Sequence, residues 1–218
     1  MNLQKVKAVL FDLDGTLLDT VNDIGTCVND VMCRYGYPKQ PLAKYRDMVG
    51  HGAKDLVRTA LPEGTADDVV DRVFEEYVLH YRENCDVLVQ YYPGVRELLT
   101  CLQDKGYKIG VITNKTEPTA KKIVGKFLPE YDFSILWGNN GVRPLKPDTE
   151  SARIACEELG VTSEEVLFVG DGDTDMEFAS KAGFIACGVT WGYRSRETLE
   201  EYGADFLVDH FAQLQKML

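Results

Sequence analysis

Short, mostly apolar runs that end abruptly at a polar residue or a glycine recur along the chain. Val6–Phe11 (VKAVLF) stops at Asp12, and Val166–Val169 (VLFV) stops at Gly170. Apolar runs of this length are typical of strands that are buried on both faces of a parallel sheet. Further candidates of the same kind are Tyr107–Thr113, Phe133–Leu136, Phe184–Cys187 and Phe206–Val208.

The segments between these runs have apolar residues at spacings of three and four, which predicts helices. They cover 95–102, Glu117–Phe127, Asp148–Leu159, Asp173–Ala182, Ser195–Tyr202 and His210–Met217. Asp148 is suited to cap the start of its helix, and Gly160 is suited to end it. Strands that alternate with helices predict an α/β fold, with a Rossmann-like, mostly parallel sheet that has helices on both faces.

The stretch from residue 17 to residue 90 differs, because its apolar pattern is helical throughout. We expect helices over 21–35, 41–48, 53–61 and 69–81, and no strand between Leu17 and Gln90. A helical block that follows the first strand is best explained as an insertion. We therefore expect an α/β core of residues 1–16 plus 91–218, a helical cap domain of residues 17–90, and hinges near Leu17–Asp19 and Val89–Tyr92.

Composition and charge narrow the function. The chain has 218 residues and a formal charge of −11, which disfavours binding to nucleic acid or to anionic membranes. No apolar run approaches the roughly 18 residues of a membrane span, and the run before Asp12 is unlike a signal peptide, so we expect a cytoplasmic protein. The six cysteines are scattered without CxxC spacing, which predicts reduced, mostly buried thiols and no zinc site.

Polar residues gather directly after the predicted strands, at positions that meet at one rim of a parallel sheet, where ligands of α/β proteins bind. They are Asp12 and Asp14, then Thr113, Asn114 and Lys115, then Lys146, and finally Asp171, Asp173 and Asp175. Crowded carboxylates repel each other, and Mg²⁺ together with a phosphate group relieves that repulsion. Of the first two carboxylates, one can attack a phosphate ester while its neighbour transfers protons.

Each motif taken alone also has a simpler interpretation. Asp12 and Asp14 would form a turn, Thr113-Asn114 a helix cap, Lys146 a solvated lysine, and Asp171–Asp175 an acidic loop. These explanations become improbable together, because four separate segments deliver compatible groups to the same rim.

Four segments, DLDGTLLDT, ITNK, LKPD and GDGDTDM, resemble in order the four motifs of the haloacid dehalogenase-like phosphatase superfamily. The helical block resembles the helical cap of that superfamily, and the likeness covers residues 7–190. YPGVRELL, the GHGA of the cap and VGDGDTDM are similar to its phosphoglycolate phosphatase-like subgroup. The resemblance implies a Mg²⁺-dependent phosphatase that hydrolyses a small phosphate monoester through an aspartyl-phosphate, with 2-phosphoglycolate as the leading substrate.

The resemblance also implies roles for the acidic residues of the rim. Asp12 would be the nucleophile and a metal ligand. Asp14 would protonate the leaving oxygen, then activate water, and give its backbone carbonyl to the metal. Asp171 would bind the metal, and Asp175 would support the site directly or through water. Asp173 is an extra carboxylate that we do not expect to touch the metal.

The remaining rim residues are implied to bind phosphate. Thr113 and Asn114 would hold the phosphoryl group, and Lys146 would pair with both the nucleophile and the phosphoryl oxygens. Gly172 departs from the subgroup, which often has Ser or Thr there. This departure removes one possible hydrogen bond, and we expect activity to remain.

The cap loop Gly50-His51-Gly52 is the candidate for substrate specificity. Its basic surroundings are Lys44, Arg46, Lys54 and Arg58, and Asp47 and Asp55 dilute that charge. An exposed polar loop is the simpler interpretation of His51. We expect His80 and His210 to be structural, and Trp191 and Tyr193 to pack near the rim.

Other functions remain open at this point. A pyrophosphatase and a phosphosugar mutase share these motifs, whereas the dehalogenase branch lacks a counterpart of Asp14. A catalytically silent regulator that binds a protein partner is a third possibility. The intact Asp12, Asp14, Lys146 and Asp171 count against it. We expect a monomer or homodimer that acts on a small phosphorylated metabolite.

Overall fold

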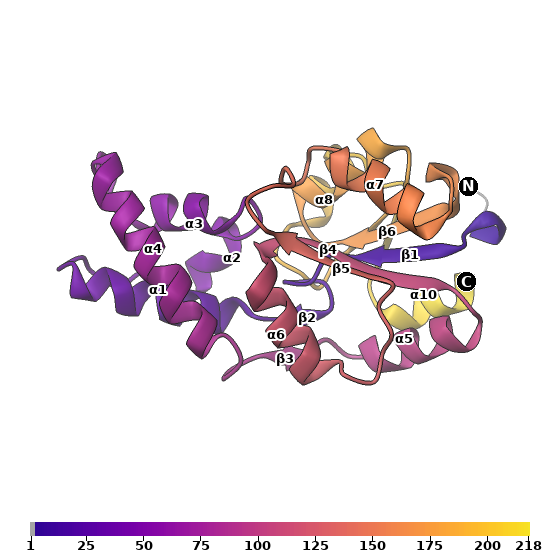
Figure 1. Cartoon of the computed structure of the whole chain (residues 1–218), viewed down its shortest axis with the longest axis horizontal. Coiled ribbons are helices and arrows are strands. Elements are labelled where there is room, and N and C mark those ends of the chain that lie inside the picture. The colour runs from indigo at the N-terminus through magenta and orange to yellow at the C-terminus, as the bar shows by residue number, and fades with distance from the viewer. Residues whose placement is uncertain (1–2) are drawn as a thin grey trace.

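The computed structural model describes residues 3–218, within which six strands form one sheet in the order β5-β4-β1-β6-β7-β8 (Figure 1). The strands are β1 (Ala8–Phe11), β4 (Lys108–Thr116), β5 (Ile135–Asn139), β6 (Val166–Gly170), β7 (Ile185–Val189) and β8 (Phe206–Val208). Every neighbouring pair is parallel. This confirms the expected α/β fold, and it places the carboxyl ends of β4, β1 and β6 side by side.

Helices cover both faces of the sheet (Figure 1). On one face lie α7 (Glu150–Leu159) and α8 (Asp173–Ala182), and on the other α5 (Val95–Asp104) and α10 (Phe211–Met217). The core also contains α6 (Glu117–Phe127), α9 (Arg196–Glu201) and 3-10 turns at Leu3–Lys5 and Ser163–Glu165. Leu10 of β1 packs in one buried cluster with Phe168, and Phe11 packs in the other with Val169. Burial on both faces explains why the strands are unbroken apolar runs.

A group of helices follows β1 and lies beyond the carboxyl ends of the strands (Figure 1). It consists of α1 (Val21–Arg34), a 3-10 turn at Leu42–Lys44, α2 (Tyr45–Met48), α3 (Ala53–Ala60) and α4 (Asp67–Asn84). α1 and α3 both pack against α4. Buried Val28 and Val31 of α1 and buried Val73 and Tyr77 of α4 belong to the same hydrophobic cluster. No helix in the described part of the chain has the length and apolar character to cross a bilayer.

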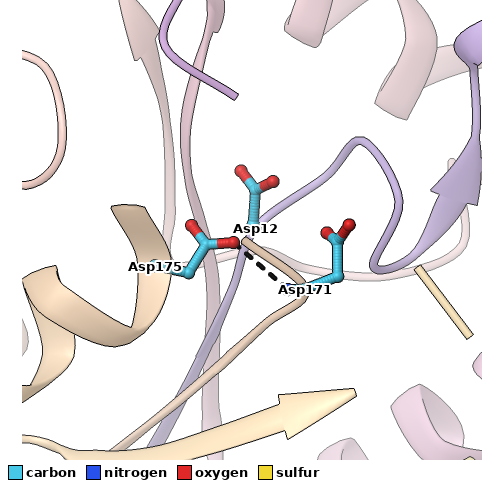
Figure 2. Close-up of side chains that lie close together, drawn as sticks. All are labelled: Asp12, Asp171 and Asp175. Atoms are coloured by element: carbon cyan, nitrogen blue, oxygen red, sulfur yellow. Dashed lines mark hydrogen bonds between the residues drawn. The ribbon is translucent and has the colours of Figure 1, made fainter. Parts of the chain in front are cut away.

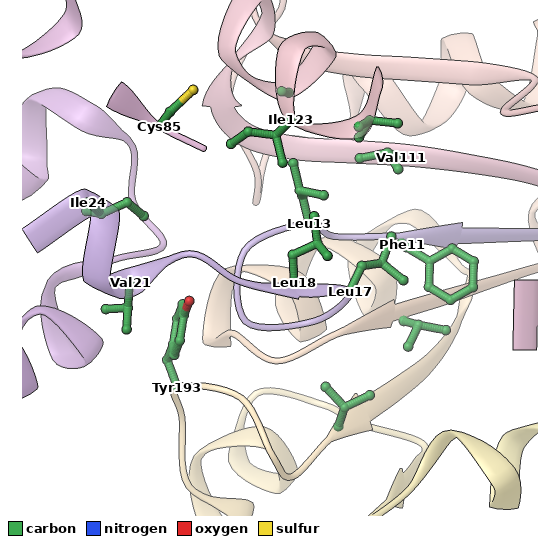
Figure 3. Packing of buried hydrophobic residues seen from close by; sticks show 14 of the residues in the cluster. Phe11, Leu13, Leu17, Leu18, Val21, Ile24, Cys85, Val111, Ile123 and Tyr193 are labelled. Carbon is green, nitrogen blue, oxygen red and sulfur yellow. The ribbon is translucent and has the colours of Figure 1, made fainter. Parts of the chain in front are cut away.

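The expectation that no strand lies between Leu17 and Gln90 is wrong. β2 (Leu18–Asp19) pairs antiparallel with β3 (Gln90–Tyr91), where the chain enters and leaves the helical group. Two-residue strands leave no periodicity in a sequence, and their partners are distant along the chain. Figure 3 shows that Leu17 and Leu18 continue the packing of Phe11 toward Val21, so one cluster extends from the sheet into the helices.

Three local predictions also differ from the structure. β4 runs to Thr116 instead of ending at Thr113. α7 begins at Glu150 with Thr149 as its N-cap residue, although Asp148 Oδ1 still accepts a hydrogen bond from the Glu150 amide at 2.9 Å. The six cysteines are free as expected, but only Cys27, Cys85 and Cys187 are buried.

Candidate active site

The carboxyl ends of the central strands open into a cavity of about 730 Å³, its open mouth included. Its polar floor comprises Asp12, Asp14, Thr113, Asn114, Lys115, Lys146, Asp171 and Asp175. Its roof is largely apolar and includes Ile24, Leu56, Tyr77 and Tyr81 from the helical group. The structure therefore brings together the predicted rim residues, and Gly50 and Gly52 also line the cavity, whereas His51 and Asp173 do not.

Three carboxylates form a cluster on the cavity floor. Asp12 follows β1, Asp171 follows β6, and Asp175 lies in the first turn of α8. One carboxylate oxygen from each lies within 4.8 Å of the others, and Figure 2 shows the three side chains grouped at the ends of these elements. Hard oxygen donors at this spacing are the ligands that Mg²⁺ prefers, so the residues present fit that cation.

Asp171 is fixed by hydrogen bonds to both of its oxygens. The Thr16 hydroxyl donates to Oδ1 at 2.8 Å, and the Tyr193 amide donates to Oδ2 at 2.8 Å. Burial raises the pKa of Asp171 well above its usual value, and the charges of Asp175 and Asp12 raise it further. An ionised Asp171 is therefore unfavourable without a nearby cation, which is the condition that a divalent metal ion relieves.

Asp175 occupies the space between the β6–α8 loop and Lys146. Its Oδ2 accepts hydrogen bonds from the amides of Gly172 at 2.9 Å and Asp171 at 3.2 Å, and the second of these is the dashed line in Figure 2. Burial raises the pKa of Asp175 to about 6, although Lys146 acts in the opposite direction. The loop thus holds this carboxylate in place before any ligand binds.

We expect Mg²⁺ to raise the melting temperature of metal-free protein more at about pH 7.5 than at about pH 5. With a pKa of about 6, Asp175 is mostly protonated at the lower pH, and a cation must displace that proton. In the metal-free protein, the raised pKa of Asp175 makes the folded state more stable at low pH than at high pH. This stabilising contribution is complete below the unfolded pKa of about 3.9, and it is lost as the pH rises through 6. Thermal melts with and without Mg²⁺ at both pH values measure this, and equal shifts would contradict it.

Lys146 is one of two buried lysines that line the cavity among the described residues. Its Nζ donates to Asp12 Oδ1 at 2.8 Å, to Asp175 Oδ1 at 2.7 Å and to the carbonyl of Ile112 at 2.8 Å. Burial alone would lower the pKa of Lys146, but the charges of Asp12 and Asp175 outweigh it, so the pKa is raised. Lys146 therefore stays charged beside Asp12, where the resemblance places it.

Asp14 has a lysine partner to which the sequence analysis assigned no role. Lys115 Nζ lies 2.8 Å from Asp14 Oδ1 and 3.0 Å from Oδ2, and it also donates to the Tyr81 hydroxyl at 2.7 Å. The Thr20 hydroxyl donates to Asp14 Oδ1 at 2.5 Å. The available signal for Lys115 was its position within the strand-end motif ITNK.

Asn114 connects three segments of the chain. Its side-chain amide donates to the carbonyls of Gly50 at 2.9 Å and Lys146 at 3.0 Å, and its Oδ1 accepts from the Lys146 amide at 2.8 Å. These bonds hold Lys146 in place and tie the cap loop to the rim. Thr113 Oγ1 accepts from the Lys115 amide at 3.3 Å, and its hydroxyl proton can still point toward a ligand.

Arg194 is a second residue that the sequence analysis missed. It donates to the carbonyls of Arg46 at 2.8 Å and Val49 at 2.7 Å and to Asp173 Oδ1 at 3.1 Å. His51 Nε2 lies 3.2 Å from the other oxygen of Asp173. Asp173 therefore pairs with these two basic groups and lies outside the acidic cluster. The rule that functional groups follow parallel strands also applies to β7, so it could have drawn attention to this arginine.

The aromatic and histidine residues that we expected to be structural occupy packing or hydrogen-bonding positions. Tyr193 is buried, and its hydroxyl accepts from the Thr20 amide at 3.2 Å. The Trp191 indole donates to the Thr16 carbonyl at 3.1 Å. His80 lies beside Asn84 on α4, and His210 is the N-cap residue of α10.

Gly15 makes room for Asp171. It has a φ of +83°, and a Cβ there would lie 2.3 Å from Asp171 Oδ2. We expect Gly15→Ala to lower the free energy of unfolding by about 1 kcal/mol more than Gly64→Ala, because the second glycine shares the backbone strain without the clash. Gly64 has a φ of +79° and no atom within 4 Å of such a Cβ. Urea unfolding measures both variants, and equal losses would show that Asp171 is not displaced.

Comparison with known proteins identifies the family. Residues 9–189 of this chain match the family of haloacid dehalogenase-like hydrolases. A phosphoglycolate phosphatase from Haemophilus influenzae is 32% identical over 225 residues, with 100% of both chains covered. An N-acetylmuramic acid 6-phosphate phosphatase from Pseudomonas aeruginosa is 34% identical over 219 residues, with 100% of this chain and 97% of the relative covered.

A solved structure with a similar description is also similar to this chain. A predicted phosphoglycolate phosphatase from Haemophilus somnus has a TM-score of 0.90 and 27% identity, with 98% of each chain covered. The chain belongs to the haloacid dehalogenase-like hydrolases. Within that family it is a phosphatase, and its resemblance to phosphoglycolate phosphatases is confirmed.

Proposed function

We propose that the protein hydrolyses a small phosphate monoester through a phosphorylated Asp12, with 2-phosphoglycolate as the leading substrate. The observation that carries the proposal is the contact of Asp12 with the buried Lys146 ammonium on the floor of a cavity. Relatives named phosphoglycolate phosphatase support the choice of substrate.

The proposed reaction has two steps. In the first, an Asp12 carboxylate oxygen bonds to phosphorus, and the bond between phosphorus and the leaving alcohol oxygen breaks. Asp14 enters this step carrying a proton and gives it to the leaving oxygen. In the second, water attacks phosphorus while Asp14 takes a proton from the water, and the bond between phosphorus and Asp12 breaks. Inorganic phosphate then leaves, and Asp12 and Asp14 return to their starting states. Lys146 stabilises negative charge on Asp12 and on the phosphoryl oxygens in both steps.

We propose Mg²⁺ as the cofactor, held by the carboxylates of Asp12, Asp171 and Asp175 and by the Asp14 carbonyl. When bound, the cation offsets the negative charge shared by these carboxylates and the phosphate group. The Thr113 hydroxyl would hold a phosphoryl oxygen. Contact of Asn114 with the phosphoryl group stays a prediction, because its amide is occupied by Gly50 and Lys146.

We also propose that residues 17–90 form a mobile cap on a core of residues 1–16 plus 91–218, of which 1–2 lie outside the described residues. The support is the pairing of β2 with β3 at both chain crossings, near the predicted hinges. The hydrogen bonds from Asn114 to Gly50 and from Arg194 to Val49 would hold the cap closed over the substrate. Closure would exclude water, and opening would release product.

We propose that Gly50 and Gly52 contribute to specificity as cavity-lining residues, whereas His51, with a side chain 46% exposed, pairs with Asp173.

Phosphate release from a panel of substrates, with Mg²⁺ and with EDTA, tests the proposal. The panel contains 2-phosphoglycolate, N-acetylmuramic acid 6-phosphate, pyrophosphate, a nucleotide monophosphate and a hexose phosphate. The second compound is included because a relative is named for it. Strong Mg²⁺-dependent release from one compound supports the proposal. Folded protein that is silent on the whole panel would favour a mutase or a partner-binding role.

The proposal includes a cytoplasmic protein that acts as a monomer or homodimer. Six free cysteines and an acidic composition support that location. Size-exclusion chromatography with light scattering distinguishes the two oligomeric states.

A further inference from the structure

We propose that Lys115 and Tyr81 form a second anion subsite, which binds a carboxylate group of the substrate while the phosphate lies at Asp12. The inference rests on the proposed function and adds the substrate class: phosphate monoesters that also carry a carboxylate. It assigns to the cap helix α4 a direct part in recognising that group.

An inventory of cations leads to Lys115. Among the described residues, the cations that line the cavity are Lys115, Lys146 and Arg194. Lys146 donates to two carboxylates and one carbonyl, which uses its three protons. Arg194 is engaged by the carbonyls of Arg46 and Val49 and by Asp173. Lys115 differs from both, because its partners are a single carboxylate, Asp14, and the Tyr81 hydroxyl. It is therefore the cation that can exchange its partner for a second anion, and a substrate carboxylate needs one because the floor carries four carboxylates.

The geometry at Lys115 suits a two-point contact. Its side chain is 4% exposed, and its ammonium lies 2.7 Å from the Tyr81 hydroxyl and 4.7 Å from the centre of the Tyr81 ring. Lys115 comes from β4 and Tyr81 from α4, so the pair spans the core and the helical group. The Tyr81 oxygen accepts from Lys115, and its own proton has no acceptor among residues 3–218. A carboxylate can therefore accept from the ammonium with one oxygen and from the hydroxyl with the other.

Tyr81 is held in the form that donates. Burial raises the pKa of Tyr81 well above its ordinary value, and the negative charge of Asp14 raises it further. The hydroxyl therefore keeps its proton at neutral pH. The hydroxyl of an exposed tyrosine could donate to water instead, so it would gain little by donating to a substrate carboxylate.

The substrate carboxylate would exchange ion partners with Asp14. Lys115 is now neutralised by Asp14, which also accepts from the Thr20 hydroxyl at 2.5 Å. When a substrate carboxylate binds Lys115, Asp14 keeps Thr20, takes up a proton from solvent and becomes free to face the leaving oxygen. A substrate without a carboxylate either leaves Asp14 tied to Lys115 or leaves a buried ammonium unpaired, and both are unfavourable. Recognition of the carboxylate is thus coupled to the positioning of Asp14.

The test compares 2-phosphoglycolate with 2-hydroxyethyl phosphate, in which a neutral hydroxymethyl group replaces the carboxylate. The measured quantity is the ratio of the two kcat/KM values. We expect Lys115→Met to lower this ratio about 10- to 100-fold, the size of a lost charge-assisted hydrogen bond, and Tyr81→Phe to lower it less. Lys121→Met removes an exposed lysine of α6 that pairs with Glu117, and it should leave the ratio unchanged.

Binding measurements separate this inference from the proposed function. Calorimetry with 3-phosphonopropionate and with propylphosphonate compares a carboxylated and a neutral phosphonate without any turnover. We expect wild-type protein to bind the first more tightly and Lys115→Met to lose that preference. The same comparison with Lys115→Arg, which keeps the charge, should retain part of it. These binding comparisons test the carboxylate subsite even if the wild type hydrolyses neither ester. Absence of hydrolysis would contradict the proposed function alone.

Two results would overturn the inference. Equal losses of kcat/KM on both esters in Lys115→Met would show that the lysine only positions Asp14. Equal wild-type affinity for the two phosphonates would show that no carboxylate is recognised. Circular dichroism of each variant verifies the fold, and Tyr81→Phe provides an independent measurement if Lys115→Met does not fold.

Discussion

Asp12→Asn protein should turn over its best substrate at least about 10⁴-fold more slowly than the wild type, by analogy with the loss of other catalytic nucleophiles. The amide nitrogen and oxygen are poor nucleophiles, and of the other two carboxylates in the cluster only Asp175 also contacts Lys146. The fold should survive, because the substitution removes one of three mutually repelling charges and keeps the size of the side chain. We expect a melting temperature no lower than that of the wild type without metal.

Acid-quenched mass spectrometry and phosphate release together measure this prediction. The wild type mixed with substrate should show one added phosphoryl group, and Asp12→Asn should show none. Asp148→Asn is the matched control, because that carboxylate is exposed and only accepts from the Glu150 amide at the start of α7. Full activity in Asp12→Asn, or a phosphorylated form of it, would exclude Asp12 as the nucleophile.

Lys146→Ala should slow turnover roughly 10²- to 10³-fold, the cost of losing one preorganised electrostatic contact. It should also destabilise the metal-free protein by about 3 kcal/mol, because Asp12 and Asp175 lose their shared buried cation. Added Mg²⁺ should restore part of the stability but not the rate. The cation can balance the carboxylates, whereas the Lys146 position beside the phosphoryl group stays empty.

Urea unfolding and phosphate release measure the two effects separately. Lys121→Ala is the control, since an exposed pair of this kind contributes at most about 0.5 kcal/mol. A Lys146→Ala rate within about threefold of the wild type would place Lys146 outside the reaction, because one electrostatic contact is worth far more. Lys146→Met, which fills the same space, distinguishes lost charge from a cavity.

The sequence predicts the sheet because each core strand is buried on both faces and is therefore a plain apolar run. It also places Asp12, Lys146 and Asp171 at one rim, since the carboxyl ends of parallel strands must meet there. The partners of these groups were harder to predict. The role of Lys115 depends on Asp14 and on Tyr81 from a distant helix, and neither contact leaves a periodic signal.

The same reasoning explains the error at β2 and β3. A two-residue strand is defined only by its partner, which lies about 70 residues away along the chain. The role of Arg194 was missed for a related reason. Its acceptors are backbone carbonyls of Arg46 and Val49, and carbonyls are the same for every residue type. A side-chain contact to the backbone of a distant segment therefore cannot be predicted from the residue types in that segment.

The β2–β3 pair also bears on how the chain folds. β1 and β4 must meet although Ala8 and its partner Lys108 are 100 residues apart, and closing so long a loop is entropically costly and slow. If the contacts of α1 with α4 form first and join Leu18 to Tyr91, the open chain left to close shrinks to under about 30 residues. Two halvings of loop length reduce the closure cost by about 1.2 kcal/mol. The inserted helices would then act as a folding aid that brings the two central strands of the sheet together.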